Sequence, residues 1–252
     1  MGGVFGKEEP TLQTGPPPPP RAEVFSVMRN GHEVLRGMMR DMTEALAQED
    51  DAKALRDFKK LWAEFKRWQA IHARMEDGIP KKVDGFFKVL DKESDGVASS
   101  NLLPEAHFTV HASETSVDKA LRTGKVAEVR EAYTAFSTVN EDHLKAEEDV
   151  MMPQVRALRE KGVDLRAMLR KDIMPTIKGG EMPFWLGAAM RVLEKHHEGK
   201  PRARVFAHAI QAISTEREWV QRHKIIRANL SPEGYATVSS QIDMSLSGGA
   251  VA

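Results

Sequence analysis

The 252-residue sequence contains no cysteine. This absence excludes disulfide bonds, thiolate zinc sites, iron–sulfur clusters and a cysteine nucleophile. Any metal ion in this protein must therefore be held by histidine, aspartate or glutamate. The sequence also lacks an excess of either charge, since Lys and Arg number 37 and Asp and Glu number 37. Without spare basic charge to neutralise phosphates, we expect no nucleic-acid partner.

Long hydrophobic runs are missing as well. No apolar stretch approaches the roughly 18 residues that span a bilayer, so we expect no membrane span. The opening segment, MGGVFGKEEP, lacks the charged start and apolar stretch of a signal peptide, and we expect a cytoplasmic protein. With 41% hydrophobic and 29% charged residues, the composition is that of a globular protein.

Three regions of the chain differ in character. Residues 1–22 contain consecutive prolines from Pro16 to Pro20, which favour polyproline II, so we expect a disordered tail there. Residues 23–155 carry long stretches with helical periodicity and almost no alternation of the β type. Residues 156–245 also have the pattern of helices, which we expect to pack on the second region.

Four amphipathic helices are predicted in the second region. Their expected ranges are about 24–47, 53–79 and 102–122, and from about 125 to Pro153, which marks an end or a kink. Further helices are expected near 154–171, 183–198, 203–227 and 231–243. Helices joined by mostly short links form antiparallel bundles. The predicted fold class is therefore all-α: an up-down-up-down four-helix bundle with additional C-terminal helices.

Histidines are concentrated on the faces of these four helices that should form the core. The histidines concerned are His32, His72, His107, His111 and His143. In the second and fourth helices, a glutamate follows the histidine by four residues, as Glu76 and Glu147. A separation of four places both side chains on one helix face, about one turn apart, within reach of one metal centre.

The positions along the helices predict that these side chains meet. At about 1.5 Å of rise per residue, the histidines of consecutive helices lie at near-equal distances from the shared connection. A buried ring of imidazoles and carboxylates is costly unless a metal neutralises it. Imidazole and carboxylate ligands without thiolate suit iron, with manganese or zinc as alternatives. Two carboxylates and four or five histidines are enough for two ions bridged by the carboxylates.

Taken in order, these segments resemble the hemerythrin-like, or HHE cation-binding, domain family over about residues 24–155. The segments are His32-Glu33, His72-Ala-Arg-Met-Glu76-Asp77, His107 to His111, and His143-Leu-Lys-Ala-Glu147-Glu148 with Met152-Pro153. The resemblance implies a four-helix bundle that holds two non-haem iron ions, joined by carboxylates and by an oxo or hydroxo bridge.

The resemblance also implies roles for individual residues. The implied terminal ligands are His32, His72, one or both of His107 and His111, and His143. The implied bridging carboxylates are Glu76 and Glu147. In oxygen-carrying hemerythrins the last carboxylate is an aspartate five residues after its histidine. Position 148 is glutamate here, so Glu147 and Glu148 both remain candidates, and the sequence looks more like the broader HHE group.

For function, the resemblance implies a protein that binds dioxygen, or a related small ligand such as nitric oxide or peroxide, at the metal pair. One alternative is a di-iron oxygenase or oxidase that acts on an organic substrate, with the C-terminal helices shaping its pocket. A second alternative is a module that senses or stores iron. A metal-free helical scaffold is the remaining interpretation.

Overall fold

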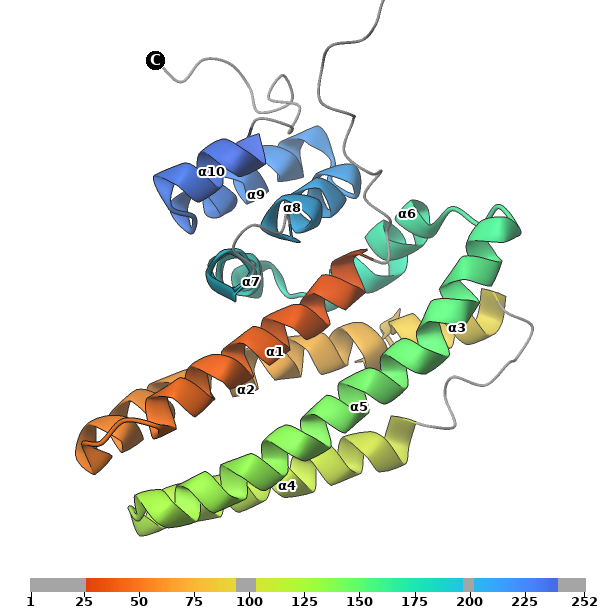
Figure 1. Ribbon diagram of the computed structural model, residues 1–252. Helices are drawn as coiled ribbons and strands as arrows, with labels where there is room; N and C mark the ends of the chain where they lie inside the picture. Colours follow the sequence, from red (N-terminus) through yellow and green to blue (C-terminus); the bar gives the residue numbers. More distant parts are fainter. Residues whose placement is uncertain (1–25, 94–102, 197–201, 240–252) are drawn as a thin grey trace, which may run out of the picture.

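The computed structural model describes residues 26–93, 103–196 and 202–239, and the predicted tail at 1–22 lies outside these ranges. The described chain is mostly helical, so the all-α prediction is confirmed at that level (Figure 1). The α-helices are α1 (Ser26–Leu46), α2 (Asp51–Asp77), α3 (Phe86–Glu93), α4 (Leu103–Thr123), α5 (Val126–Glu160), α6 (Leu165–Met168), α7 (Met182–His196), α8 (Arg202–Ala212), α9 (Glu216–Ala228) and α10 (Pro232–Ser239).

Helices α1 and α2 form one pair of neighbours, and α4 and α5 form another (Figure 1). Short connections join each pair. Asp50 caps α2 by accepting a hydrogen bond from the amide of Lys53, and Gly124, with φ of 71°, allows the sharp turn before α5. Helix α5 also contacts both α1 and α2, so one core lies among the four helices.

Aromatic side chains fill this core on the side of the two short connections. Trp62 of α2 stacks on Phe65 and meets Phe136 of α5 edge to face, with ring centroids 4.9 Å apart. Phe58 packs edge to face against Tyr133. Such aromatic pairs contribute more than the area they bury, and they fix the spacing of α2 and α5 next to the histidines.

Two helix boundaries differ from the sequence prediction, and in both cases the helix does not end at the proline. Helix α5 continues through Pro153 to Glu160, so the expected helix end and the predicted region boundary at residue 155 both fall inside it. Proline removes one helical hydrogen bond, but buried Val155 and Leu158 anchor the following turns to the core. Helix α2 ends at Asp77, because Gly78 adopts φ of 82° before Pro80 is reached.

The connection from α2 to α4 contains structure that the periodicity did not predict. Strands β1 (Gly78–Ile79) and β2 (Val83–Asp84) pair antiparallel, and α3 follows them. Gly85 is required here, since a Cβ at this position would lie 2.0 Å from the carbonyl oxygen of Glu76. These residues pack directly against the C-terminal end of α2, which carries part of the histidine and glutamate cluster.

After α5 and α6 the chain passes through a π-helical turn, Leu169–Ile173, and two short 3₁₀ turns, Met174–Thr176 and Gly179–Glu181. Helix α7 then packs along α1. Gly37 allows this close approach, because a Cβ there would lie 2.3 Å from Cγ1 of Val192. The indole of Trp185 in α7 stacks on that of Trp68 in α2, and Trp68 Nε1 donates to the Trp185 carbonyl.

The helix expected at 203–227 is divided into α8 and α9. Thr215 accepts a hydrogen bond from the amide of Glu218, and the Glu218 carboxylate accepts one from the amide of Thr215. This capping box starts a new helix, which the periodicity alone did not reveal. The predicted helix at 231–243 corresponds to α10, and its last expected residues lie outside the described ranges.

Candidate metal centre

Four helices direct imidazoles and carboxylates at one place in the core. The residues that meet are His32 from α1, His72 and Glu76 from α2, His107 from α4, and His143 and Glu147 from α5. All except His107 are almost completely buried, and the His107 side chain is 15% exposed. The structure brings these six side chains together at one level of the helices, as the sequence predicted.

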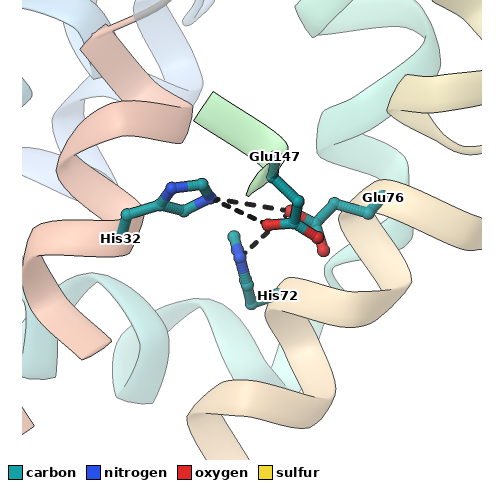
Figure 2. A group of neighbouring side chains, drawn as sticks. All are labelled: His32, His72, Glu76 and Glu147. Carbon is teal, nitrogen blue, oxygen red and sulfur yellow. Dashed lines mark ion pairs between the residues drawn. The ribbon is translucent and has the colours of Figure 1, made fainter. Parts of the chain in front are cut away.

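Two histidines face one side of the carboxylates, as Figure 2 shows. His32 Nε2 lies 3.4 Å from Glu147 Oε2 and 3.8 Å from Glu76 Oε1. His72 Nε2 lies 3.0 Å from Glu76 Oε1. One ligand atom from each of these four residues lies within 4.8 Å of the others, a spacing that suits a single metal ion.

A second pair of histidines faces the other oxygens of the same carboxylates. His143 Nε2 lies 3.0 Å and His107 Nε2 lies 3.5 Å from Glu147 Oε1. His107 Nε2 also lies 3.8 Å from Glu76 Oε2. Each glutamate therefore has one oxygen near a member of each histidine pair, and His107, His143 and Glu147 form a second group whose ligand atoms lie within 4.8 Å of one another.

Many of these atoms are buried without a hydrogen-bond partner, although they approach one another closely. The buried atoms concerned are His32 Nε2, His72 Nε2, His107 Nε2, Glu76 Oε1 and both carboxylate oxygens of Glu147. Native proteins rarely leave buried polar atoms unpaired, because each one costs free energy. A cation between the lone pairs removes this cost. The donor set of imidazole nitrogen and carboxylate oxygen therefore fits a metal site.

Two further carboxylates orient His32 and His107 through the ring nitrogen, Nδ1, that faces away from the cluster. Glu148 Oε1 lies 3.0 Å from His32 Nδ1, and Arg36 Nη1 donates to the same oxygen at 2.7 Å. Asp77 Oδ2 lies 3.3 Å from His107 Nδ1. In metal sites, a histidine ligand commonly donates its other ring N–H to a carboxylate, which fixes the tautomer and the ring orientation.

This geometry separates the roles of Glu147 and Glu148. Burial would raise the pKa of the Glu148 carboxyl, but contacts with His32 and Arg36 outweigh burial and lower the pKa to about 2. The ionised carboxylate can only accept, so His32 Nδ1 must donate to it, and His32 Nε2 keeps its lone pair for a metal. Glu147 is the residue whose oxygens lie among the histidines, and Glu148 holds His32 in place.

The carboxylates also shift the pKa values of the histidines. Burial opposes a charge on His32, but contacts with Glu148, Glu76 and Glu147 outweigh it and raise its pKa to about 9. For His107, burial is likewise outweighed by Asp77 and Glu147, and its pKa rises to about 10. Without a metal, the cluster therefore binds protons where the cations would sit.

The two carboxylates respond in the opposite direction. Burial would raise the pKa of Glu76, but His72 and His32 lower it well below its usual range. Burial and the neighbouring Glu76 would raise the pKa of Glu147, but His107 and His143 lower it. Both carboxylates are therefore ionised at neutral pH and ready to act as metal ligands.

His111, one of the two candidates on α4, does not join the cluster. Its side chain is 69% exposed, and Nδ1 lies 3.0 Å from Glu114 Oε2. Four residues correspond to slightly more than one helical turn, so His111 lies one turn beyond His107 and further round towards solvent. Of the two histidines that the sequence left open, the structure brings only His107 among the other five residues.

The sequence analysis did not identify the orienting role of Asp77 and Glu148. Each follows one of the two central glutamates directly, and each contacts a histidine on a neighbouring helix. A second acidic residue directly after the glutamate of a His-x-x-x-Glu spacing is the sequence signal that could have identified them. The same order, histidine, glutamate, second acid, occurs in α2 and in α5, so the two halves of the cluster are arranged alike.

A small pocket adjoins the cluster between α2 and α4. Its volume is about 60 Å³, and it is lined by four members of the cluster, His72, Glu76, His107 and His143, together with Gln69 and His111. A water molecule needs roughly 10–15 Å³ of such space. The pocket therefore has room for a ligand of a few atoms next to the histidines.

A third group of metal-ligating residue types lies at the surface, where Asp41, Glu44 and His196 approach one another. Lys195 Nζ donates to both carboxylates there, and His196 Nε2 lies 2.7 Å from Asp41. A lysine already neutralises these acids, so this group has the character of an ion-pair network between α1 and α7.

Comparisons with protein-family models, with curated proteins and with solved structures found no match for this chain. Among the described residues, none of the helices combines the length and the apolar character needed to cross a membrane.

Proposed function

We propose that this protein is a hemerythrin-like four-helix bundle that holds two non-haem iron ions and binds a small ligand there, namely dioxygen, nitric oxide or peroxide. One observation supports this most strongly. Glu76 faces His32 and His72 with Oε1 and His107 with Oε2, while Glu147 faces His32 with Oε2 and both His107 and His143 with Oε1. A single ion would leave half of these donors unused.

The donor set supports the choice of metal. Each ion would have two imidazole nitrogens and two carboxylate oxygens, with no thiolate in the chain. Such mixed nitrogen and oxygen ligation is typical of non-haem iron, and manganese and zinc accept related sets. When bound, the iron pair would supply redox-active centres with coordination positions left open for a small ligand.

The protein's own residues have three tasks in this proposal. His32, His72, His107 and His143 bind the ions as terminal ligands, and the two glutamates hold the ions together. Glu148 fixes the ring of His32, and Asp77 fixes the ring of His107, so that Nε2 of each faces inward. Met75 and Leu144, which directly adjoin Glu76 and His143 in the sequence, are buried, and a site shielded from bulk water has stronger electrostatic contacts.

The size of the adjoining pocket favours a small ligand over an organic substrate. Pockets for organic ligands of drug size usually measure about 300–1,000 Å³, whereas this one measures about 60 Å³. An oxygenase or oxidase of organic molecules would need more space beside the ions. We therefore favour ligand binding over the oxygenase alternative.

Element analysis of the purified chain, combined with optical spectra taken without oxygen and in air, tests the proposal. We expect two iron ions per chain and a visible absorption band that changes when air or nitric oxide is admitted. A metal content below one ion per chain would reject the dinuclear centre. Two ions of zinc with no optical response would keep the centre but reject the small-ligand function.

A further inference from the structure

Gln69 is a buried polar residue in the wall of the pocket that has no role in holding metal. It lies on α2 three residues before His72, on the same helix face. Gln69 is only 8% exposed. Its Nε2 donates to Asn140 Oδ1 at 3.2 Å, whereas its Oε1 has no hydrogen-bond partner among the described residues.

The direction of this amide is fixed by its neighbours. Asn140 is fully buried on α5, and its Nδ2 donates to the sulfur of Met39 at 3.5 Å. The thioether of Met39 can only accept, so Asn140 must turn its NH₂ towards α1 and its oxygen towards Gln69. Gln69 then has to use its NH₂ for Asn140. The atom left without a partner is therefore an acceptor, and not a donor.

A buried acceptor in the wall of the pocket that adjoins the cluster distinguishes ligands by whether they carry a hydrogen to donate. Dioxygen and nitric oxide carry no hydrogen and cannot satisfy Gln69 Oε1. Hydrogen peroxide has an O–H on each oxygen, so one oxygen can face the ions while the other donates to the amide. A site whose buried acceptor is paired only by the correct ligand discriminates against analogues that lack the donor.

We propose that Gln69 is a specificity-determining residue, which makes a protic ligand of two heavy atoms, hydrogen peroxide, the preferred ligand of the centre. This inference rests on the proposed metal centre and narrows its ligand class. It involves binding only, through one hydrogen bond from the ligand O–H to Gln69 Oε1. The aprotic ligands bind without this contact.

Binding to the full-length protein loaded with zinc tests the inference, because zinc does not consume the ligand. Hydroxylamine serves as a protic probe with the same number of heavy atoms as hydrogen peroxide, and azide serves as an aprotic probe. Calorimetric titration gives a Kd for each. In the variant Gln69→Leu, which keeps a buried side chain but carries no hydrogen-bond acceptor, we expect the Kd of hydroxylamine to rise about five- to tenfold. The Kd of azide should stay unchanged.

Two further variants make the result specific. Gln69→Glu keeps an acceptor and adds a negative charge, so hydroxylamine binding should persist while azide binding weakens. Gln48→Leu makes the same substitution at a glutamine that bonds to Asp57 and does not line the pocket, and it should change neither Kd. Equal weakening of both probes in Gln69→Leu, or no weakening of either, would overturn the inference although the metal centre stands. Failure of the wild-type chain to bind two zinc ions would overturn the proposed function itself.

Discussion

Glu148 Oε1 lies 3.0 Å from Nδ1 of His32, on the side of the imidazole ring away from the buried glutamates. Arg36 holds the same carboxylate oxygen at 2.7 Å. Because the ionised carboxylate accepts from Nδ1, His32 Nε2 faces Glu76 and Glu147 and is the ring nitrogen available to a metal. Glu148 thus orients the His32 ring through Nδ1, without contacting Nε2, the nitrogen that faces the metal site.

Removing this carboxylate should weaken metal binding without removing a ligand. In Glu148→Ala we expect the affinity for the ion on the His32 side to fall about 10- to 100-fold, the usual effect of losing such a partner. Competition with a chelator of known affinity measures the change. Glu141→Ala is the matched control, since Glu141 contacts Arg36 but no histidine of the cluster. An equal loss in both variants would mean that Arg36, and not the contact with His32, is responsible.

Substitution of His143 and of His111 should have different effects on metal content. His143 Nε2 lies 3.0 Å from Glu147, so His143→Ala should lose at least one ion per chain and destabilise α5. His111 is exposed and paired with Glu114, so His111→Ala should keep both ions. Element analysis of the two purified variants decides this. A loss of metal in His111→Ala would show that His111 belongs to the centre.

The packing of α7 on α1 should depend on the absence of a side chain at position 37. In Gly37→Ala the new Cβ meets Cγ1 of Val192 at 2.3 Å. We expect a net loss of about 1–3 kcal/mol in the free energy of unfolding, because overpacking outweighs the better helix propensity of alanine. Urea denaturation measures it.

Adding Val192→Ala to this variant should recover part of the loss, since it removes the clashing methyl groups. Gly179→Ala is a control where nothing lies within 4 Å, and it should stay within about 0.5 kcal/mol of the wild type. If Gly37→Ala were as stable as that control, the close approach of α1 and α7 would be refuted.

The pH dependence of stability should differ between metal-free and metal-loaded protein. In the metal-free form, His32 and His107 have pKa values raised from 6.5 to about 9 and about 10. Their contribution to stability is complete below pH 6.5 and is lost as the pH rises through 9 to 10. Glu76 and Glu147 have lowered pKa values, so their contribution is present above pH 4.5 and is lost as the pH falls through their folded-state values.

Metal ligands must be deprotonated, so metal binding strengthens as the pH rises over the same range. The difference in Tm between loaded and metal-free protein should therefore widen from about pH 6.5 to about pH 9. Differential scanning calorimetry of both forms measures it. A constant difference across this range would mean that His32 and His107 do not exchange protons for metal.

The sequence predicted most of the cluster because its spacing obeys helix geometry. His72 and Glu76, and likewise His143 and Glu147, are separated by four residues on helices whose other faces are polar. Periodicity could not decide between His107 and His111, because a spacing of four residues places both near one face of α4. They differ in exposure, since His107 is turned to the core and His111 to solvent. The role of Gln69 depends on contacts between three helices, which no local pattern contains.

Other parts of the fold escaped prediction for similar reasons. Pro153 suggested an end to α5, but the tertiary contacts of the following turns outweigh one lost hydrogen bond. The hairpin of β1 and β2 has strands of two residues each, too short to produce a periodic signal. Only the capping box at Thr215 and Glu218 was readable in principle, as a Thr-x-x-Glu pattern.

X-ray absorption at the iron edge of the purified, iron-loaded protein addresses the dinuclear centre most directly. We expect imidazole and carboxylate ligands and a second iron about 3.5 Å from the first, with the iron–iron contribution lost in Glu147→Ala. A spectrum that shows isolated iron with no metal neighbour in the wild-type protein would contradict the dinuclear centre.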